Sequence, residues 1–233
     1  MKLYMHPVSM TSRPVRLLIA ENDLKVDEVL VDLMTGEHHQ EAYASLNPNK
    51  LVPLLIDGDL RLTESSAILK YLADKHDLPS YPKDLKQRAK VNELMDWFNT
   101  NFYRDWAYNM AYPQIFPNHK RATDDVQQAT IAWGSERSKS WLTVLDKHWI
   151  GPKNNWVAGS EQITIADYFG ACLLTLGEVL RCDFTPYPNV QRWLSNVKEL
   201  KSWPAVNRAS GARGLLGNFR ATASNFSATR SQL

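Results

Sequence analysis

The order of strand and helix patterns in the first 76 residues limits the folds that this chain can adopt. Short runs with β-branched or alternating apolar residues predict four strands, over residues 2–5, 26–33, 51–56 and 60–63. The Asp57-Gly58 pair between the last two runs predicts a hairpin. Apolar residues at helical spacing predict helices over residues 13–21 and 65–75. With a further helix between the second and third strands, the order is β-α-β-α-β-β-α, which indicates an α/β domain.

A different pattern begins after residue 76. Residues 77–84 include Pro79 and Pro82, and proline stops helices and stiffens linkers. Segments with few helix breakers then predict helices over residues 85–112, 123–148, 164–180 and 188–199. We therefore expect three units in the chain: an α/β domain at 1–78, an all-α domain at 85–215 and a flexible tail at 216–233.

The end of the chain is basic and allows two interpretations. Residues 201–233 contain five Lys and Arg residues and no acidic residue. A frayed, solvated end is one interpretation, because chain ends are poorly ordered unless they are tied down. The other is a segment that folds over the mouth of a pocket.

Composition excludes several classes of protein. The chain has 27 Lys and Arg against 25 Asp and Glu, so it lacks the concentrated positive charge that nucleic acids and anionic membranes attract. Its two cysteines, Cys172 and Cys182, form no C-x-x-C pair and no zinc-type set, so we expect no metal. There is no apolar run of signal-peptide or membrane-span length. We therefore expect a cytoplasmic protein.

Two motifs in the α/β domain have the chemistry to bind a peptide. A proline after Val52, at the start of a strand, is a candidate for a cis peptide bond, which would leave the Val52 N–H and C=O free to pair with an extended ligand. Glu64 and Ser65 stand where a strand ends and a helix begins. The first helical turn and the Ser65 hydroxyl attract a carboxylate, and Glu64 attracts an ammonium group. An ordinary N-cap is the alternative for Ser65.

Two further polar segments complete the set. In residues 8–13, a hydroxyl beside a helix start can donate to an anion, and a thiolate held there would have a lowered pKa. A polar turn with one capping hydroxyl is the alternative. His38, Asn49 and Lys50 lie in polar connections, where they either meet a second carboxylate or remain solvated.

In this order and spacing, the four motifs resemble the thioredoxin-like domain of cytosolic glutathione transferases over residues 2–75, and the helical remainder resembles the family's second domain. The most specific stretches are Asn47-Pro48-Asn49-Lys50-Leu51-Val52-Pro53 and Thr63-Glu64-Ser65-Ser66-Ala67-Ile68. Thr164 and Asp167 form a predicted capping box that resembles the family's folding motif, so Asp167 is expected to be structural.

The resemblance also implies roles for individual residues. Ser9 precedes Ser12-Arg13 by the interval typical of the serine-type, theta- and delta-like branch, which implies that Ser9 stabilises the glutathione thiolate. Ser12 replaces a cysteine of that branch, so Thr11 and Ser12 are rival hydroxyls. The resemblance implies that glutathione is bound by His38, Lys50, Val52, Pro53, Glu64 and Ser65. The residues expected to line a pocket for the electrophile are Thr11, Ser12, Tyr103 and Trp106.

The implied function is a homodimeric glutathione transferase that activates the glutathione thiolate for attack on small hydrophobic electrophiles. Glutathione would be the co-substrate. Two alternatives remain open. One is a glutathione-dependent reductase of disulfides or peroxides, and the other is a non-catalytic binding module, because one fold serves several functions.

Overall fold

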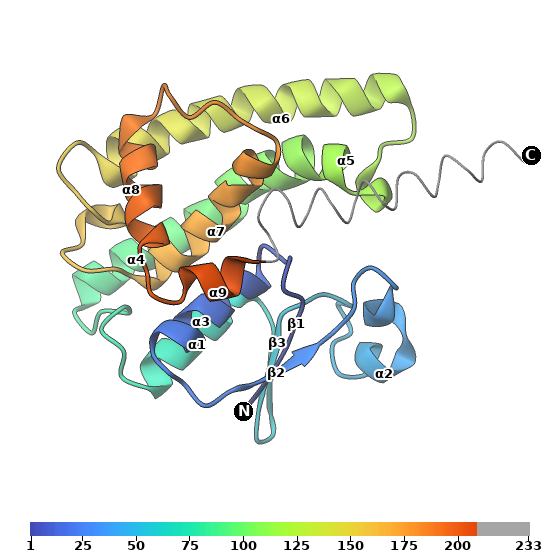
Figure 1. Cartoon of the computed structure of the whole chain (residues 1–233), viewed down its shortest axis with the longest axis vertical. Coiled ribbons are helices and arrows are strands. Elements are labelled where there is room, and N and C mark those ends of the chain that lie inside the picture. Colours follow the sequence, from blue (N-terminus) through green and yellow to red (C-terminus); the bar gives the residue numbers. More distant parts are fainter. Residues whose placement is uncertain (209–233) are drawn as a thin grey trace, which may run out of the picture.

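The computed structural model describes residues 1–208. Its N-terminal part contains a four-stranded sheet in the order β2-β1-β3-β4 (Figure 1). β1 runs parallel to β2 and antiparallel to β3, and β4 is antiparallel to β3. The strands are β1 (Lys2–Met5), β2 (Asp27–Leu30), β3 (Leu54–Asp57) and β4 (Leu60–Leu62). The expected α/β domain with a thioredoxin-like βαβ arrangement is confirmed.

The two faces of this sheet are covered by different helices. Leu3, Met5 and Leu55 pack with α1 (Ser12–Glu21) and α3 (Ser65–Lys75) in the main hydrophobic core. Side chains alternate between the faces of a strand, so neighbouring Leu54 points to the other face, where it packs with Tyr43 of α2. That short helix, α2 (Glu41–Ala44), follows the 3-10 turn η1 (Glu37–His39).

The second part consists of helices, as expected (Figure 1). It begins with α4 (Leu85–Trp97), which continues into two π-helical segments, η2 (Phe98–Phe102) and η3 (Arg104–Ala111). The remaining elements are α5 (Tyr112–Ile115), η4 (Pro117–His119), α6 (Asp124–Val144), η5 (Leu145–Ile150), η6 (Val157–Gly159), α7 (Ile165–Val179), α8 (Pro188–Lys198) and α9 (Trp203–Asn207). Among these described helices, none combines the length and apolarity needed to cross a membrane.

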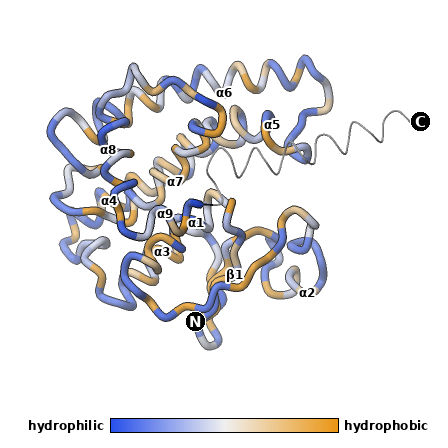
Figure 2. The backbone as a smooth tube through the Cα atoms, viewed as in Figure 1, coloured by the Kyte–Doolittle hydropathy of each residue, from blue (hydrophilic) through white to orange (hydrophobic). Residues whose placement is uncertain are grey.

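Helix α7 forms the centre of the core. Apolar residues concentrate along it, whereas the outer loops are polar (Figure 2). Gly170 and Gly177 allow Phe98 and Trp106 to pack directly against its backbone, where a Cβ would overlap the aromatic rings. Helices α1 and α4 pack along α7, so this helix joins the two parts of the chain.

The predicted capping box at the start of α7 is confirmed. The Asp167 carboxylate accepts hydrogen bonds from the Thr164 N–H and hydroxyl, the Val157 N–H and the Trp193 indole, at 2.7–2.9 Å. Burial outweighs these four donors and raises the pKa of Asp167 to about 6. Asp167 is therefore structural.

Some element boundaries differ from those expected. The third strand begins at Leu54 instead of residue 51, because Pro53 has no N–H to contribute to a ladder. The second strand is limited to Asp27–Leu30. The expected helix over 85–112 divides into α4 and its π-helical continuation. The expected tail at 216–233, and the question of whether it covers a pocket, lie outside the described residues.

Candidate functional site

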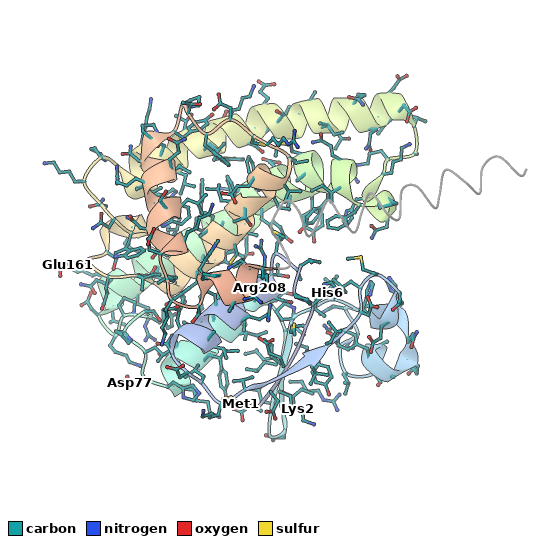
Figure 3. The ribbon with its side chains drawn as sticks, viewed as in Figure 1. Met1, Lys2, His6, Asp77, Glu161 and Arg208 are labelled. Atoms are coloured by element: carbon teal, nitrogen blue, oxygen red, sulfur yellow. The ribbon has the colours of Figure 1, made fainter. Side chains whose placement is uncertain are left out.

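The strand pairing brings the four sequence motifs to one edge of the sheet. Tyr4 pairs with Leu54, so the end of β1 lies beside the start of β3. Leu55 pairs with Leu62, which places the end of β4 at that edge, and the parallel strand β2 ends there too. His6, labelled in Figure 3, follows β1 at this edge, and Lys2 marks the opposite end of the strand.

Ser9 lies in the turn between β1 and α1. Its Oγ accepts a hydrogen bond from the Ser12 N–H at 3.2 Å and lies 3.1 Å from Thr11 Oγ1. Thr11 Oγ1 donates to the Val52 carbonyl at 3.0 Å. Because a carbonyl can only accept, the Thr11 hydrogen is committed there, so Ser9 is the donor to Thr11. Ser9 Oγ thus accepts from the N–H of the first residue of α1, and its hydroxyl hydrogen, directed to Thr11 here, can rotate toward another acceptor.

The rival hydroxyl of Ser12 has a different environment. Ser12 is fully buried, and its Oγ has no hydrogen-bond partner among the described residues. A side chain in this position does not reach a ligand at the surface. The expectation that Ser12 lines an electrophile pocket is therefore not supported by its burial, whereas Ser9 and Thr11 are partly exposed.

The peptide bond between Val52 and Pro53 is cis, as predicted. The Val52 carbonyl is already bonded to Thr11, so it is less available than expected. The Val52 N–H, by contrast, has no acceptor within residues 1–208. Val52 and Pro53 are both buried, and an unpaired donor in such surroundings favours binding of an acceptor.

The start of α3 is open to an anion. Glu64 precedes the helix with a φ of 62°, which non-glycine residues rarely adopt. Neither Glu64 nor Ser65 caps the first turn, so the alternative of an ordinary N-cap at Ser65 is wrong. Ser65 is 5% exposed and is the first helical residue. The N–H groups of this turn are thus left for a bound carboxylate.

His38 and Lys50 come from segments on either side of α2. The half-buried His38 ring lies 3.9 Å from that of His39, and burial lowers the pKa of His38. Near pH 7 His38 is consequently neutral, and it can donate one hydrogen bond. Lys50 is exposed, and its ammonium has no carboxylate partner in the described part of the chain.

Aromatic side chains in and beside η3, α5 and η4 form one cluster. The Tyr103 and Tyr112 hydroxyls are 2.6 Å apart, and burial raises the pKa of both far above the usual value, so both remain protonated. Tyr112 lies within electrostatic range of the Arg13 guanidinium. The cluster of edge-to-face or tilted rings comprises Tyr103, Tyr108, Tyr112, Phe116 and His119.

Trp106 does not belong to this aromatic cluster. It is 1% exposed, its indole N–H donates to the Leu173 carbonyl at 3.0 Å, and its ring stacks on Phe102. The expectation that Trp106 lines an electrophile pocket therefore needs correction, because its side chain fills the core against α7. The four-residue spacing of Phe98, Phe102, Trp106 and Met110 is a core signal that distinguishes it from Tyr103.

Arg13 connects this site to the helical part of the chain. Its fully buried guanidinium donates to the Cys172 carbonyl, to Thr175 Oγ1 and to Asn207 Oδ1, at 2.7–2.8 Å. The start of α1 is thereby fixed against α7 and α9. Sequence patterns did not indicate these contacts, since the partners lie more than 150 residues away.

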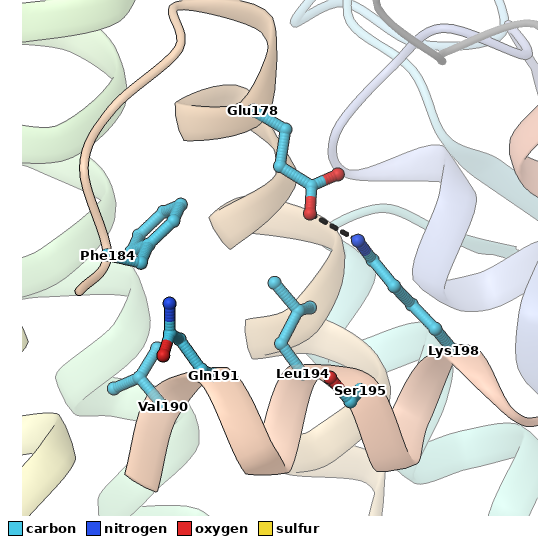
Figure 4. Close-up of a pocket in the computed structure, with 7 residues that line it drawn as sticks. All are labelled: Glu178, Phe184, Val190, Gln191, Leu194, Ser195 and Lys198. Carbon is cyan, nitrogen blue, oxygen red and sulfur yellow. Dashed lines mark hydrogen bonds and ion pairs between the residues drawn. The ribbon is translucent and has the colours of Figure 1, made fainter. Parts of the chain in front are cut away.

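One surface pocket, of about 380 Å³, lies elsewhere, between the end of α7 and α8 (Figure 4). The ion pair between Glu178 and Lys198 closes one side, and Phe184 lies opposite. None of the predicted site residues lines it. Within residues 1–208, no three His, Cys, Asp or Glu side chains cluster as metal ligands do.

Comparisons with known proteins agree with this geometry. Residues 1–74 match the model of the glutathione S-transferase N-terminal domain, and residues 127–201 match that of the C-terminal domain. The chain is 31% identical to a delta-class glutathione transferase of Nilaparvata lugens with a solved structure. That alignment covers 94% of this chain and 98% of the other, with a TM-score of 0.77.

Two curated proteins show similar identity over shorter shares of their length. The chain is 32% identical over 215 residues to glutathione S-transferase T3 of Arabidopsis thaliana, covering 85% of this chain and 35% of that protein. It is 40% identical over 119 residues to glutathione S-transferase theta-1 of Homo sapiens, which covers 50% of each. The chain thus spans about a third of the first relative and half of the second.

Proposed function

This chain belongs to the glutathione S-transferase family and is theta/delta-like, and from that membership we propose that it activates the glutathione thiol for attack on small hydrophobic electrophiles. The observation that carries the proposal is the hydrogen-bonded series from Ser9 through Thr11 to the Val52 carbonyl. It joins a hydroxyl suited to a thiolate with a backbone segment suited to a peptide. Such a pairing is what binding and activation of a thiol-containing peptide require.

Ser9 is the proposed catalytic residue. Its hydroxyl hydrogen, directed to Thr11 in the free protein, would rotate to the sulfur while Oγ still accepts from the Ser12 N–H. A hydrogen bond to a charged acceptor is worth about 1.5–3 kcal/mol, or roughly one to two pKa units on the bound thiol. The thiol proton leaves to water, and Ser9 only donates a hydrogen bond.

The rest of glutathione would bind along the same edge of the sheet. The Val52 N–H would donate to a carbonyl of the ligand backbone, next to Pro53. The γ-glutamyl carboxylate would meet the uncapped first turn of α3 at Ser65, and Glu64 would receive the ammonium group. His38 and Lys50 would meet the glycyl carboxylate, His38 as a neutral donor.

The electrophile would lie against the aromatic cluster. Thr11 and Tyr103 are the proposed pocket residues, Thr11 beside Ser9 and Tyr103 within the aromatic cluster. The sulfur lone pair forms the new C–S bond, and a leaving group departs with the electron pair of the broken bond. Aromatic rings and protonated hydroxyls suit apolar electrophiles with a polar acceptor.

We also propose a cytoplasmic homodimer that acts in detoxification, as the family membership suggests. Sedimentation at micromolar concentration tests the dimer. A monomer there would contradict it.

The function is tested by titrating the protein with glutathione in a calorimeter. Cysteinylglycine, which lacks the γ-glutamyl group, is the matched control ligand, and we expect it to bind at least about tenfold more weakly. Binding is followed by turnover assays with an aryl halide, a haloalkane, an organic hydroperoxide and a glutathione-capped disulfide.

The outcomes separate the candidates. Conjugation of either halide supports the transferase. Turnover of only the hydroperoxide or the disulfide supports the reductase alternative. No detectable glutathione binding would overturn both and leave a non-catalytic module.

A further inference from the structure

Two buried side chains hold the backbone carbonyl of Leu51. The Tyr43 hydroxyl donates to it at 2.6 Å and the Asn47 side-chain amide at 2.7 Å. Tyr43 is 4% exposed and Asn47 is 1% exposed, so both donors belong to buried side chains, whereas Leu51 itself is exposed. No other backbone carbonyl near the cis-proline receives two side-chain donors within residues 1–208.

The orientation of both donors is determined by their surroundings. Asn47 Oδ1 accepts from the Asn49 N–H at 3.1 Å, so the amide nitrogen of Asn47 is the atom that faces Leu51. Burial raises the pKa of Tyr43, so its hydroxyl remains a donor at neutral pH. The Tyr43 ring also packs 6.0 Å from that of Tyr4 in β1.

These bonds determine where the next N–H points. In a trans peptide group the C=O and N–H point in opposite directions. Only the Val52–Pro53 bond is cis among the described residues, so the Leu51–Val52 group is trans. With the Leu51 carbonyl drawn toward Tyr43 and Asn47, the Val52 N–H points away from them. It is the same N–H that lacks an acceptor in the described part of the chain.

We propose that Tyr43 and Asn47 are positioning residues that aim the Val52 N–H at a backbone carbonyl of the peptide ligand. The inference rests on the proposed function, because it concerns the same glutathione site. Neither side chain touches the ligand. Each acts through the Leu51–Val52 peptide group, and fixing that group before binding reduces the entropy lost on binding.

The hydrogen bonds from Tyr43 and Asn47 to Leu51 also connect two parts of the proposed glutathione site. Tyr43 belongs to α2 and Asn47 to the turn after it, and η1, which carries His38, comes just before. The segment that would meet the glycyl carboxylate therefore also holds the segment that would pair with the ligand backbone. Displacing α2 would disturb both contacts together.

The first test uses the protein without ligand. Tyr43→Phe removes one hydroxyl, and Asn47→Asp keeps the bond from Asn49 while replacing the donor to Leu51 by an acceptor. Both variants should shift the Val52 amide resonance in protein labelled with 15N-valine, because the Leu51–Val52 peptide group loses a bond that orients it. Tyr71→Phe is the matched control, because it also removes a 2.6 Å tyrosine hydrogen bond, here to Asp57. It should leave the Val52 amide unchanged.

The second test adds glutathione. Tyr43→Phe should weaken glutathione binding about three- to tenfold, and Asn47→Asp at least as much, as expected for loss of one hydrogen bond that orients the site. The pKa of the bound thiol, read from thiolate absorbance, should stay at the wild-type value, because Ser9 is untouched. Tyr71→Phe should bind glutathione as the wild type does.

Each outcome decides the matter. An unchanged Val52 amide in both variants would overturn the inference, with or without ligand. Wild-type glutathione affinity in both variants would overturn it while leaving the proposed function intact. If the wild-type protein itself binds no glutathione, the proposed function fails, and the inference fails with it. A shifted amide with weaker binding and an unchanged thiol pKa supports it.

Discussion

Two helix starts in this molecule carry similar polar residues, but the hydrogen-bonding groups are all paired at one start and partly available at the other. At the start of α7, Thr164 and Asp167 form a closed cluster in which the carboxylate accepts four hydrogen bonds. At the start of α1, Ser9 and Thr11 form an open one, which still holds a rotatable hydroxyl hydrogen beside the unpaired Val52 N–H.

The difference between them lies in burial and in what remains unpaired. Asp167 is fully buried with its acceptors saturated, so it can only stabilise the fold. Ser9 is partly exposed, and each unpaired group beside it costs stability until a ligand supplies a partner. Open hydrogen-bonding groups at a helix start are therefore a better sign of a binding site than the residue types alone.

Removing the Asp167 carboxylate should give the largest effect on stability. Asp167→Ala leaves the buried Trp193 indole and the Val157 and Thr164 N–H groups without acceptors. The free energy of unfolding should therefore fall by at least about 3 kcal/mol. Urea denaturation measures this. Asp59→Ala, at an exposed aspartate whose carboxylate has no partner within residues 1–208, is the control and should change little. If Asp167→Ala were as stable as the wild type, the conclusion that this cluster stabilises the fold would be wrong.

The pH dependence of stability sharpens the same prediction. Folding raises the pKa of Asp167 from 3.8 to about 6, so the folded state holds this proton more tightly than the unfolded state. The contribution is complete below about pH 4 and is lost as pH rises through about 6. Asp167→Asn should remove this fall in stability between pH 4 and 6, as measured by denaturation at each pH.

At the open cluster, Ser9→Ala should raise the pKa of the bound glutathione thiol by roughly one to two units and slow turnover near neutral pH. Glutathione affinity should change little. Loss of the bond from the Ser12 N–H should also cost about 1 kcal/mol of stability. Thiolate absorbance in Ser9→Ala, Thr11→Ala and Ser12→Ala decides between the hydroxyls. The assignment is wrong if only Ser12→Ala moves the pKa.

Two substitutions of Glu64 should separate its effect on glutathione binding from its effect on stability. Glu64→Ala should weaken glutathione binding by roughly 1–3 kcal/mol, since it removes the partner of a charged ammonium. Glu64→Gly should weaken binding equally yet stabilise the protein by about 1 kcal/mol, because glycine adopts the φ of 62° without strain. Calorimetry and denaturation measure the two effects. Unchanged affinity in both variants would remove Glu64 from the site.

Ser12 should show the smallest effect. Its buried hydroxyl has no partner within residues 1–208, so Ser12→Ala should leave stability unchanged or raise it by up to about 1 kcal/mol. Ser9→Ala, one turn earlier, is the matched comparison and should lower stability. A marked loss of stability in Ser12→Ala would show that its hydroxyl has a partner.

Local patterns were sufficient for the fold because its elements are set by local chemistry. The Asp57-Gly58 turn, the capping box at Thr164 and the proline-containing segment after α3 each lie where the sequence indicated. The errors occurred at element ends. Because of Pro53, β3 begins at Leu54, later than expected. The helix from Leu85 changes from α-helical to π-helical hydrogen bonding after Trp97.

The site was less predictable, because its key contacts join distant residues. The bond from Thr11 to Val52 crosses 41 positions, and those of Arg13 to α7 cross about 160. No local spacing reports such contacts. Burial also separated residues that the sequence grouped together: Trp106 lies in the core, whereas Tyr103 joins the aromatic cluster.

The buried guanidinium of Arg13 limits how this chain can be recombined with its relatives. Four positions after Ser9, it takes its acceptors from α7 and α9, so the helical part holds the turn that carries the proposed catalytic hydroxyl. Exchanging the helical part for that of another family member should therefore disturb the proposed catalytic Ser9 as well as the proposed electrophile pocket. A chimera that joins the two parts at residues 76–84 must therefore carry Thr175 and Asn207, or equivalent acceptors, to keep the side-chain contacts of Arg13 that hold this turn.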